Sequence, residues 1–328
     1  MRKSVVHKSF LSCAVLIAAF AAWTTPAASQ TYPARPVRLV VPFPPGGPAD
    51  IFGRLVAIKL GQALGEQFVV DNRGGGNGNI GAELVARAAP DGYTLLLLPS
   101  ALAANASLYS KLPYSLTRDF TGVASLGTFP LMLVTHPSLP AKSVHELIAL
   151  AKAKPGELTF ASAGSGGGAH LAAETFALAS AIKIVHVPYK GTGPAVLGVL
   201  GGQVSLMFAS VPSVLQHVRA GKLTALAVTS AQRSPALPEL PTIAEQALPG
   251  YELVSWFGMV APAGTAPEIL KRLNAELRAL IAAPDFQARL KDEGGQPLSM
   301  TPEEFTAFLR HETERWAKIV RDVGAKLD

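Results

Sequence analysis

The stretch VRLVVPFPPGGPADIFGRLVAIKL, residues 37–60, joins a strand pattern directly to a helix pattern. Residues 37–43 are almost continuously apolar, as in a strand that is covered on both faces. Over residues 48–64 the apolar side chains recur at the i, i+4 spacing of one helix face, and Gly65 follows as a stop signal. The loop between the two elements consists of prolines and glycines. It therefore offers mainly backbone groups for any chemistry.

Strand and helix patterns alternate along the rest of the chain. Near-continuous apolar strands that are separated by helices predict an α/β fold with mainly parallel sheets covered by helices. We expect further strands at 67–73, 93–99, 130–137, 158–163, 182–189, 204–210, 223–230 and 252–262. We expect helices at 80–89, 143–155, 170–181, 194–202 and 211–221, and three more from 267 to 328.

The first 29 residues have the layout of a secretory signal peptide. A basic start is followed by an apolar run at 10–23, which only Ser12 interrupts, and then by the small residues of TTPAASQ. The run is shorter than the roughly 20 apolar residues of a transmembrane helix. We therefore expect cleavage near Ala28 or Ser29 and a mature protein in the periplasm.

Charge and cysteine content narrow the function classes. The formal net charge is +6, and three basic residues without any acid lie in the predicted signal peptide, which leaves +3 for the mature chain. The remaining Lys and Arg are scattered, whereas nucleic-acid binding shows as a clustered basic face, so we expect no nucleic-acid partner. The only cysteine, Cys13, also lies in the signal peptide. The mature chain can therefore form no disulfide and no cysteine-ligated metal site, and its dispersed histidines predict no metal.

Two further glycine-rich loops offer the alternative of an enzyme. GGGNGNIG (74–81) and AGSGGGAH (163–170) each approach the G-x-G-x-x-G spacing, but neither follows the first strand or precedes a suitably placed acid. Ser165 lacks the first glycine of the G-x-S-x-G nucleophile elbow, and His170 is too near in sequence to be a triad base. An α/β hydrolase or a dinucleotide-dependent oxidoreductase is the alternative function. We expect no cofactor and no catalytic residue.

Anion capture is the function that suits such loops best. A helix N-terminus has unpaired backbone N–H groups and a partial positive charge, so it can hold a carboxylate without lysine or arginine. Glycines allow the ligand to approach the backbone closely. Each αβ unit has one such loop, PPGGPAD or AGSGGGAH. If the units face each other, the two helix termini form a binding cleft.

Five segments resemble the Bug-type periplasmic solute receptors of tripartite tricarboxylate transporters. They are YPARPVRLVVPFPPGGPADIFGRLVA, VVDNRGGGNGNIGAELVARAAPDGYTLLL, VHVPYKGTGPAVLGVLGGQVSLMFAS, LAVTSAQRSPALPELPTIAEQALPGYE and WFGMVAPAGT, in order through the mature chain. The resemblance implies a two-lobed, type II-like Venus-flytrap fold with a ligand cleft. Lobe 1 would comprise 30–127 plus 252–328 and lobe 2 would comprise 128–251, with crossings near Thr128 and Tyr251.

The resemblance also implies the function and the site. Such receptors hold a small organic carboxylate largely with the backbone amides of two loops, here 43–50 and 161–170. Gly167 replaces a usual serine, and Ala209 replaces a frequent acid, which disfavours an amino acid as ligand. We expect a monomer, with membrane transporter subunits as partners. The implied ligand-binding residues are Phe43, Pro44, Gly46, Gly47, Pro48, Ala49, Asp50, Ser100, Ala161, Ser162, Gly164, Ser165, Gly166, Gly167, His170, Tyr189, Phe208 and Ala209.

Some of these side chains have a structural interpretation as well. Asp50 is best interpreted as a helix cap, because a carboxylate in the ligand contact would repel an anion. His170 either caps the helix or contacts the ligand. Asn72 is expected to support loop architecture, and Trp256 either lines the cleft or belongs to the core.

Overall fold

The computed structural model describes residues 32–324 and 326. Residues 35–328 form one compact unit, and every element below belongs to it. The predicted signal peptide and its cleavage site lie outside the described residues. Among the described residues, no helix combines the length and apolar character that a membrane span requires.

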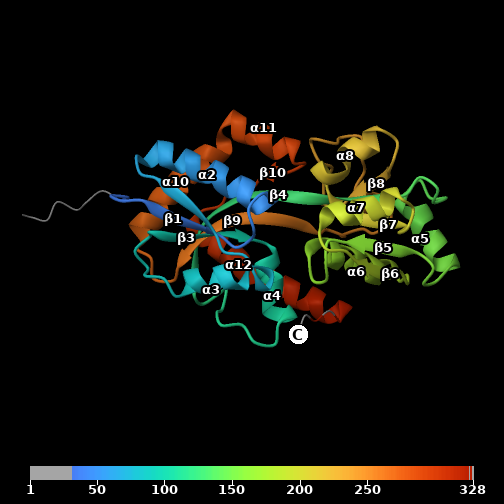
Figure 1. The fold of residues 1–328 in the computed structure, drawn as a ribbon, viewed down its shortest axis with the longest axis horizontal. Coiled ribbons are helices and arrows are strands. Elements are labelled where there is room, and N and C mark those ends of the chain that lie inside the picture. Colours follow the sequence, from blue (N-terminus) through green and yellow to red (C-terminus); the bar gives the residue numbers. More distant parts are fainter. Residues whose placement is uncertain (1–31, 325, 327–328) are drawn as a thin grey trace, which may run out of the picture. The chain divides into compact units, whose positions relative to one another are not determined.

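Strands and helices alternate through most of the unit (Figure 1). The strands are β1 (Val37–Val41), β2 (Phe68–Asn72), β3 (Thr94–Pro99), β4 (Phe120–Thr135), β5 (Thr159–Ser162), β6 (Val185–Pro188), β7 (Leu206–Ser210), β8 (Thr224–Val228), β9 (Val254–Pro262) and β10 (Gln296–Pro297). The helices are α2 (Pro48–Leu64), α3 (Asn79–Ala86), α4 (Ala101–Leu108), α5 (Val144–Ala153), α6 (Gly168–Ser180), α7 (Thr192–Leu200), α8 (Val211–Arg219), α9 (Ile243–Gln246), α10 (Pro267–Ala282), α11 (Pro284–Asp292) and α12 (Pro302–Val323), with the 3₁₀ turn η1 (Gly76–Gly78).

The predicted α/β alternation is confirmed, and the strand directions are more mixed than predicted. The strand order is β2-β1-β3-β9-β4-β7-β5-β6, and β8 and β10 also pair with β4. The neighbours β2-β1-β3 and β7-β5-β6 are parallel, as expected. All antiparallel pairs among the described strands involve β4 or β9. A strand that passes from one sheet into another can run against both, which local apolar patterns do not reveal.

Strand β4 links the two parallel groups. Its first part, Phe120 to Pro130, pairs with β9, and its last part, from Leu131, pairs with β7. Figure 1 shows β4 and β9 running from the group around β1 and β3 to the group around β5 and β7. The change of partner at Leu131 lies close to the expected crossing near Thr128.

Helix α12 packs on β9 because a glycine leaves room for it. A Cβ atom added to Gly258 would lie 2.0 Å from the Phe305 ring, so no other residue fits beneath that ring. Phe305 is fully buried. Trp256, which lies on β9 like Gly258, packs edge-to-face against the Phe305 ring. The indole of Trp256 donates to Glu312 Oε2 at 2.8 Å. These contacts fix α12 beside the strand that enters the site described next.

Candidate functional site

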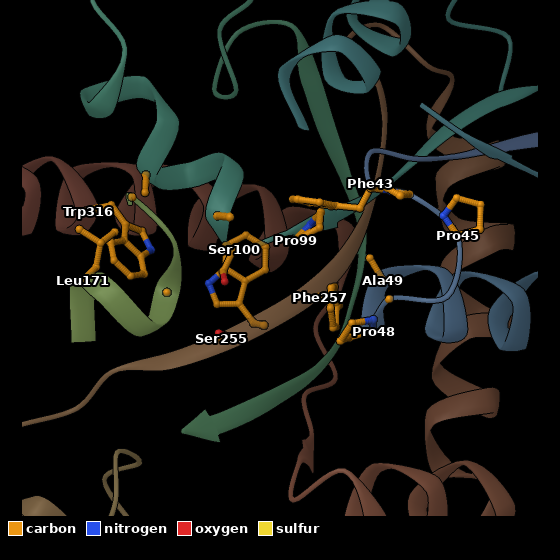
Figure 2. Close-up of a pocket in the computed structure, with 17 residues that line it drawn as sticks. Phe43, Pro45, Pro48, Ala49, Pro99, Ser100, Leu171, Ser255, Phe257 and Trp316 are labelled. Carbon is orange, nitrogen blue, oxygen red and sulfur yellow. The ribbon is translucent and has the colours of Figure 1, made fainter. Parts of the chain in front are cut away.

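A cavity of about 400 Å³ lies where the glycine-rich loops, β3, β9 and α12 meet (Figure 2). A volume of this size suits a small organic molecule. The lining residues are mostly apolar and include no Lys, Arg, His, Asp or Glu. They are Phe43, Pro44, Pro45, Gly47, Pro48, Ala49, Pro99, Ser100, Ala101, Ala104, Gly166, Gly168, Leu171, Ser255, Trp256, Phe257 and Trp316.

The first glycine-rich loop, which we call loop 1 (residues 43–50), ends in a bare helix N-terminus. The N-cap of α2 is Gly47, its backbone is extended, and no side chain caps the helix. Pro48 occupies the first helical position, where its missing N–H costs nothing. Gly46 has a φ of +85°, a conformation that glycine adopts readily. The free N–H groups of the first helical turn therefore face outward without a side-chain acceptor.

Asp50 holds loop 1 in this conformation. Its carboxylate is buried and accepts hydrogen bonds from Gly46 N (2.9 Å), Asn72 Nδ2 (3.0 Å) and Arg54 Nε (3.0 Å). The hydrogen bond from Arg54 and then that from Gly46 lower the pKa of Asp50 to about 2. Asp50 was expected to cap the helix. It instead caps the preceding loop, and Gly47 is the N-cap.

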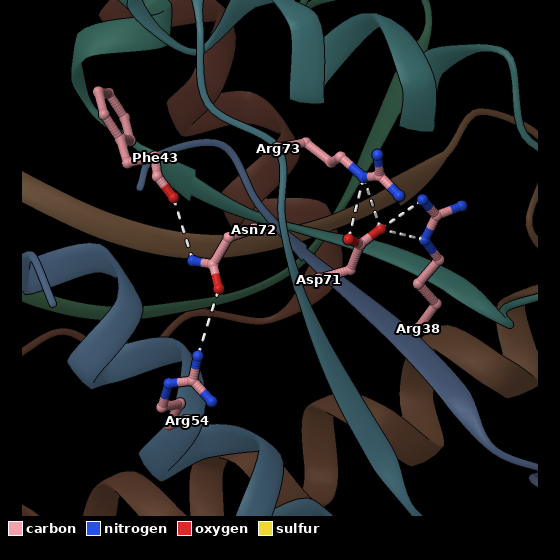
Figure 3. Close-up of polar contacts among 6 residues, drawn as sticks. All are labelled: Arg38, Phe43, Arg54, Asp71, Asn72 and Arg73. Carbon is pink, nitrogen blue, oxygen red and sulfur yellow. Dashed lines mark hydrogen bonds and ion pairs between the residues drawn. The ribbon is translucent and has the colours of Figure 1, made fainter. Parts of the chain in front are cut away.

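Asn72 ties the same loop to the neighbouring strand β2 (Figure 3). Its amide donates to the Phe43 carbonyl at 3.0 Å and accepts from Arg54 at 3.3 Å. The predicted architectural role of Asn72 is therefore confirmed. The next residue, Asp71, lies between Arg38 and Arg73, which together keep this strand end ion-paired.

The second glycine-rich loop, which we call loop 2 (residues 161–170), repeats this design. Gly167 is the N-cap of α6, is extended and has no side-chain cap, and Gly166 before it has a φ of +75°. The Gly166 N–H donates to His170 Nδ1 at 3.1 Å, just as Gly46 N–H donates to Asp50. In both loops a side chain in the first helical turn bonds the loop backbone and leaves the helix N–H groups free. The two loops border the same cavity through Gly47 and Gly166.

Two stacked histidines set the electrostatics of loop 2. The rings of His170 and His186 lie 4.1 Å apart, and Phe160 stacks on His186 at 4.8 Å. Burial, and then the adjacent His186, lower the pKa of His170 to about 4, and burial also lowers the pKa of His186. A neutral His170 can accept through Nδ1, and its Nε2 faces Glu174 at 3.6 Å. Burial raises the pKa of Glu174.

The lowered pKa of His170 predicts a loss of stability in mild acid. Between pH 6.5 and about 4 the unfolded chain binds a proton at His170 that the folded chain does not. The contribution of neutral His170 is therefore complete above pH 6.5 and decreases as the pH falls toward 4. We expect the protonation of His170 to lower the free energy of unfolding by about 2–3 kcal/mol over this pH range.

Urea unfolding of the parent, His170→Gln and His145→Gln from pH 7 to pH 4 measures this effect. His145 is exposed on α5 and is the matched control. His170→Gln should lose less stability over this range than the parent, and His145→Gln should follow the parent. If the stabilities of the parent and of His170→Gln decreased equally with falling pH, the predicted contribution of His170 would be excluded.

The structure brings part of the predicted residue set to the cavity. The members that line it are Phe43, Pro44, Gly47, Pro48, Ala49, Ser100 and Gly166. Those that hold the loops from behind or lie beside them are Gly46, Asp50, Ala161, Ser162, Gly164, Ser165, Gly167 and His170. Tyr189 packs against Gly198, and Phe208 and Ala209 are buried in hydrophobic clusters.

Several lining residues were missed by the motif search. Ser255, Trp256 and Phe257 come from β9, and only Trp256 had been considered for the cleft. Leu171 and Trp316 come from helices whose amphipathic patterns indicate packing alone. Ser255 to Phe257 could have been found from the predicted crossing near Tyr251, since a strand that follows such a crossing passes the cleft. Trp316 has no local signal in the sequence.

Two groups of strands that β4 links, with one uncapped helix terminus from each group at a common cavity, define a two-lobed ligand-binding protein. The family model "Tripartite tricarboxylate transporter family receptor" matches residues 52–325. The chain belongs to this family, whose members are periplasmic solute-binding receptors. It is 42% identical over 304 residues to the protein BugT of Bordetella pertussis, and the match covers 92% of this chain and 93% of the relative.

Solved structures support the same assignment. A Rhodopseudomonas palustris protein, Rpa4515 with adipate, is 38% identical with a TM-score of 0.80, covering 90% of this chain and 100% of that chain. MatC from the same organism, with bound malate, is 32% identical with a TM-score of 0.75, covering 88% and 100%. The periplasmic binding protein BugD is 36% identical with a TM-score of 0.76, covering 90% and 99%. The predicted family and fold class are thus confirmed.

Proposed function

We propose that this chain is a periplasmic receptor that captures a small organic carboxylate and delivers it to a tripartite tricarboxylate-type transporter. The free N–H groups at the starts of α2 and α6 bind the carboxylate. The two lobes, 30–127 plus 252–328 and 128–251, close over the ligand about β4 and β9. The proposal includes export by the predicted signal peptide and a monomeric receptor.

The matched design of the two loops is the observation that carries this proposal. Each loop has a glycine at positive φ, an extended N-cap glycine and no side-chain cap, and each borders the same cavity. A carboxylate is the group that such helix termini attract, because it can accept several N–H donors and complements the helix dipole. The apolar lining around these termini suits the carbon chain of an organic acid.

The lining residues also argue against an amino acid as ligand. An ammonium group that leaves water requires a carboxylate or several acceptors. Among the residues that line the cavity there is no acid, and Ala209, which replaces the family's frequent acid, is buried in a hydrophobic cluster. The adipate and malate bound to two of the solved relatives are organic acids without an ammonium group.

A catalytic role is disfavoured by the placement of the serines. Ser165 is exposed and lies outside the cavity lining. Ser162 lies 2.6 Å from His186 Nε2, but it is fully buried and its hydroxyl donates to the Gly164 carbonyl. A hydroxyl has one proton, and the Ser162 proton is already donated to Gly164. His186 must therefore be the donor in its contact with Ser162, so its imidazole is not placed to act as a general base.

Thermal-shift measurements against a panel of organic acids test the proposal. At about 100-fold excess over its dissociation constant, a ligand should add roughly 2.7 kcal/mol of stability. We expect shifts with mono- and dicarboxylates, and none with glutamate or phosphate. Stabilisation by none of the carboxylates, or turnover of one at a rate proportional to protein concentration, would contradict the proposed function.

A further inference from the structure

Trp316 has a buried indole N–H without a partner at the edge of the cavity. The side chain lies on α12, is 2% exposed and belongs to the cavity lining. Its Nε1 makes no hydrogen bond within the described part of the chain. Buried tryptophan N–H groups normally find a partner, because an unpaired one loses its hydration without compensation. The group therefore requires an acceptor that the folded chain does not supply.

The other tryptophan of the cavity lining, Trp256, has a hydrogen-bond acceptor for its indole N–H. Trp256 donates to Glu312 Oε2 at 2.8 Å, and Arg315 donates to the other oxygen of Glu312 at 3.1 Å. Glu312 lies one helical turn before Trp316 on α12. The same helix thus provides a buried acceptor for one indole and leaves the other indole without one.

The position of Trp316 indicates which part of a ligand it would contact. Figure 2 shows Trp316 and Leu171 at the end of the site opposite Pro48 and Ala49, with the Trp316 nitrogen on the ring edge turned toward Ser100. Between the two ends the wall is mostly apolar. Its polar side chains there are Ser100 and Ser255.

We propose that Trp316 donates its indole N–H to an oxygen at the far end of the ligand. The preferred ligands are then carboxylates with an apolar chain and a second acceptor oxygen beyond it, either a second carboxylate or a hydroxyl. The inference rests on the proposed function, in which the starts of α2 and α6 hold the first carboxylate. Nε1 is fully covered in this structure, so the proposal includes a shift of the cavity wall on ligand binding that brings this nitrogen into contact with the ligand oxygen.

Calorimetric titration with matched acids tests this assignment. For each chain length from four to eight carbons, the unsubstituted acid, the ω-hydroxy acid and the α,ω-diacid are compared. We expect the parent to prefer an oxygenated acid over the plain acid of equal length by about ten-fold, the effect of one hydrogen bond to a polar or charged group. Trp316→Phe keeps an aromatic wall but removes the donor, and it should abolish most of this preference.

Leu171→Ala is the matched control, because it alters the same end of the cavity without removing a donor. It should weaken binding of all acids of one length by a similar factor and preserve their ratio. An unchanged ratio in Trp316→Phe would overturn the assignment while leaving the proposed function intact. Failure of every acid to bind the parent would overturn both.

A spectroscopic measurement on the parent does not depend on the folding of the variant. With ¹⁵N-labelled tryptophan, the Trp316 indole resonance should move downfield on addition of the preferred diacid or hydroxy acid and much less with the plain acid. The resonance is assigned by its loss in Trp316→Phe or, if that variant does not fold, by elimination with Trp256→Phe. Equal shifts with the oxygenated and plain acids would contradict a direct hydrogen bond.

Discussion

Replacing Gly47 with valine is expected to weaken carboxylate binding by about ten-fold to a hundred-fold while the protein remains folded. Gly47 has the extended backbone of an N-cap, which valine can adopt, and the nearest atom to an added Cβ is Pro44 O at 3.9 Å. The fold therefore tolerates the side chain. Gly47 also lines the cavity, so the branched side chain would cover the N–H groups of the α2 terminus. Loss of one hydrogen bond to a charged ligand costs about 1.5–3 kcal/mol, which corresponds to this range.

Two variants serve as controls for Gly47→Val. Gly193→Val makes the same substitution at an exposed glycine in the first turn of α7, where an added Cβ meets nothing within 4 Å. Lys190→Ala removes an exposed positive charge close to loop 2. Both should bind with nearly the parent affinity if backbone dipoles provide the attraction. Titration calorimetry on variants with unchanged circular dichroism decides, and parent-like affinity of Gly47→Val would exclude loop 1 as the carboxylate site.

The parts of the site that could be predicted are those with local signals. The bounds of α2 follow from Pro48 and Gly65, which start and stop a helix by their own backbone preferences. The glycines and prolines that leave loops 1 and 2 with few side chains are likewise consecutive in the sequence. The family resemblance then indicated that both loops contribute to one site, an inference that periodicity alone does not give.

The parts that could not be predicted depend on long-range packing. Helix α4 was not expected, because its apolar residues are spread around the helix and give no face with a clear period. The sequence also does not reveal that Asp50 and His170 have the same role, because a carboxylate and an imidazole share no sequence pattern. Their common role follows from which backbone N–H each accepts. Trp316 reaches the cavity from α12, which packs on β9 where Gly258 leaves room for Phe305, a contact between residues far apart in sequence.

Asp50→Ala is expected to destabilise the protein by about 2–4 kcal/mol and to weaken carboxylate binding as well. Removal of the carboxylate leaves Gly46 N–H and the Asn72 amide without their acceptor and Arg54 without its ion-pair partner. Hydrogen bonds to charged groups contribute about 1.5–3 kcal/mol each, and water replaces part of what is lost at the exposed Arg54. Loop 1 would no longer hold Gly46 at positive φ, so the α2 terminus would be less well ordered for its ligand.

The matched control is Asp285→Ala, because Asp285 also pairs with a basic residue of α2. Asp285 contacts Lys59 at 2.6 Å, but its side chain is 59% exposed, so its removal should cost far less stability than the removal of the buried Asp50 carboxylate. The pH dependence of stability further distinguishes Asp50 from Asp285. The lowered pKa of Asp50 means that its contribution is present above pH 3.8 and decreases as the pH falls toward about 2. Urea unfolding gives the stabilities and titration calorimetry the affinities. If Asp50→Ala lost affinity with unchanged stability, the carboxylate would act on the ligand directly, and the role of Asp50 in ordering loop 1 would be wrong.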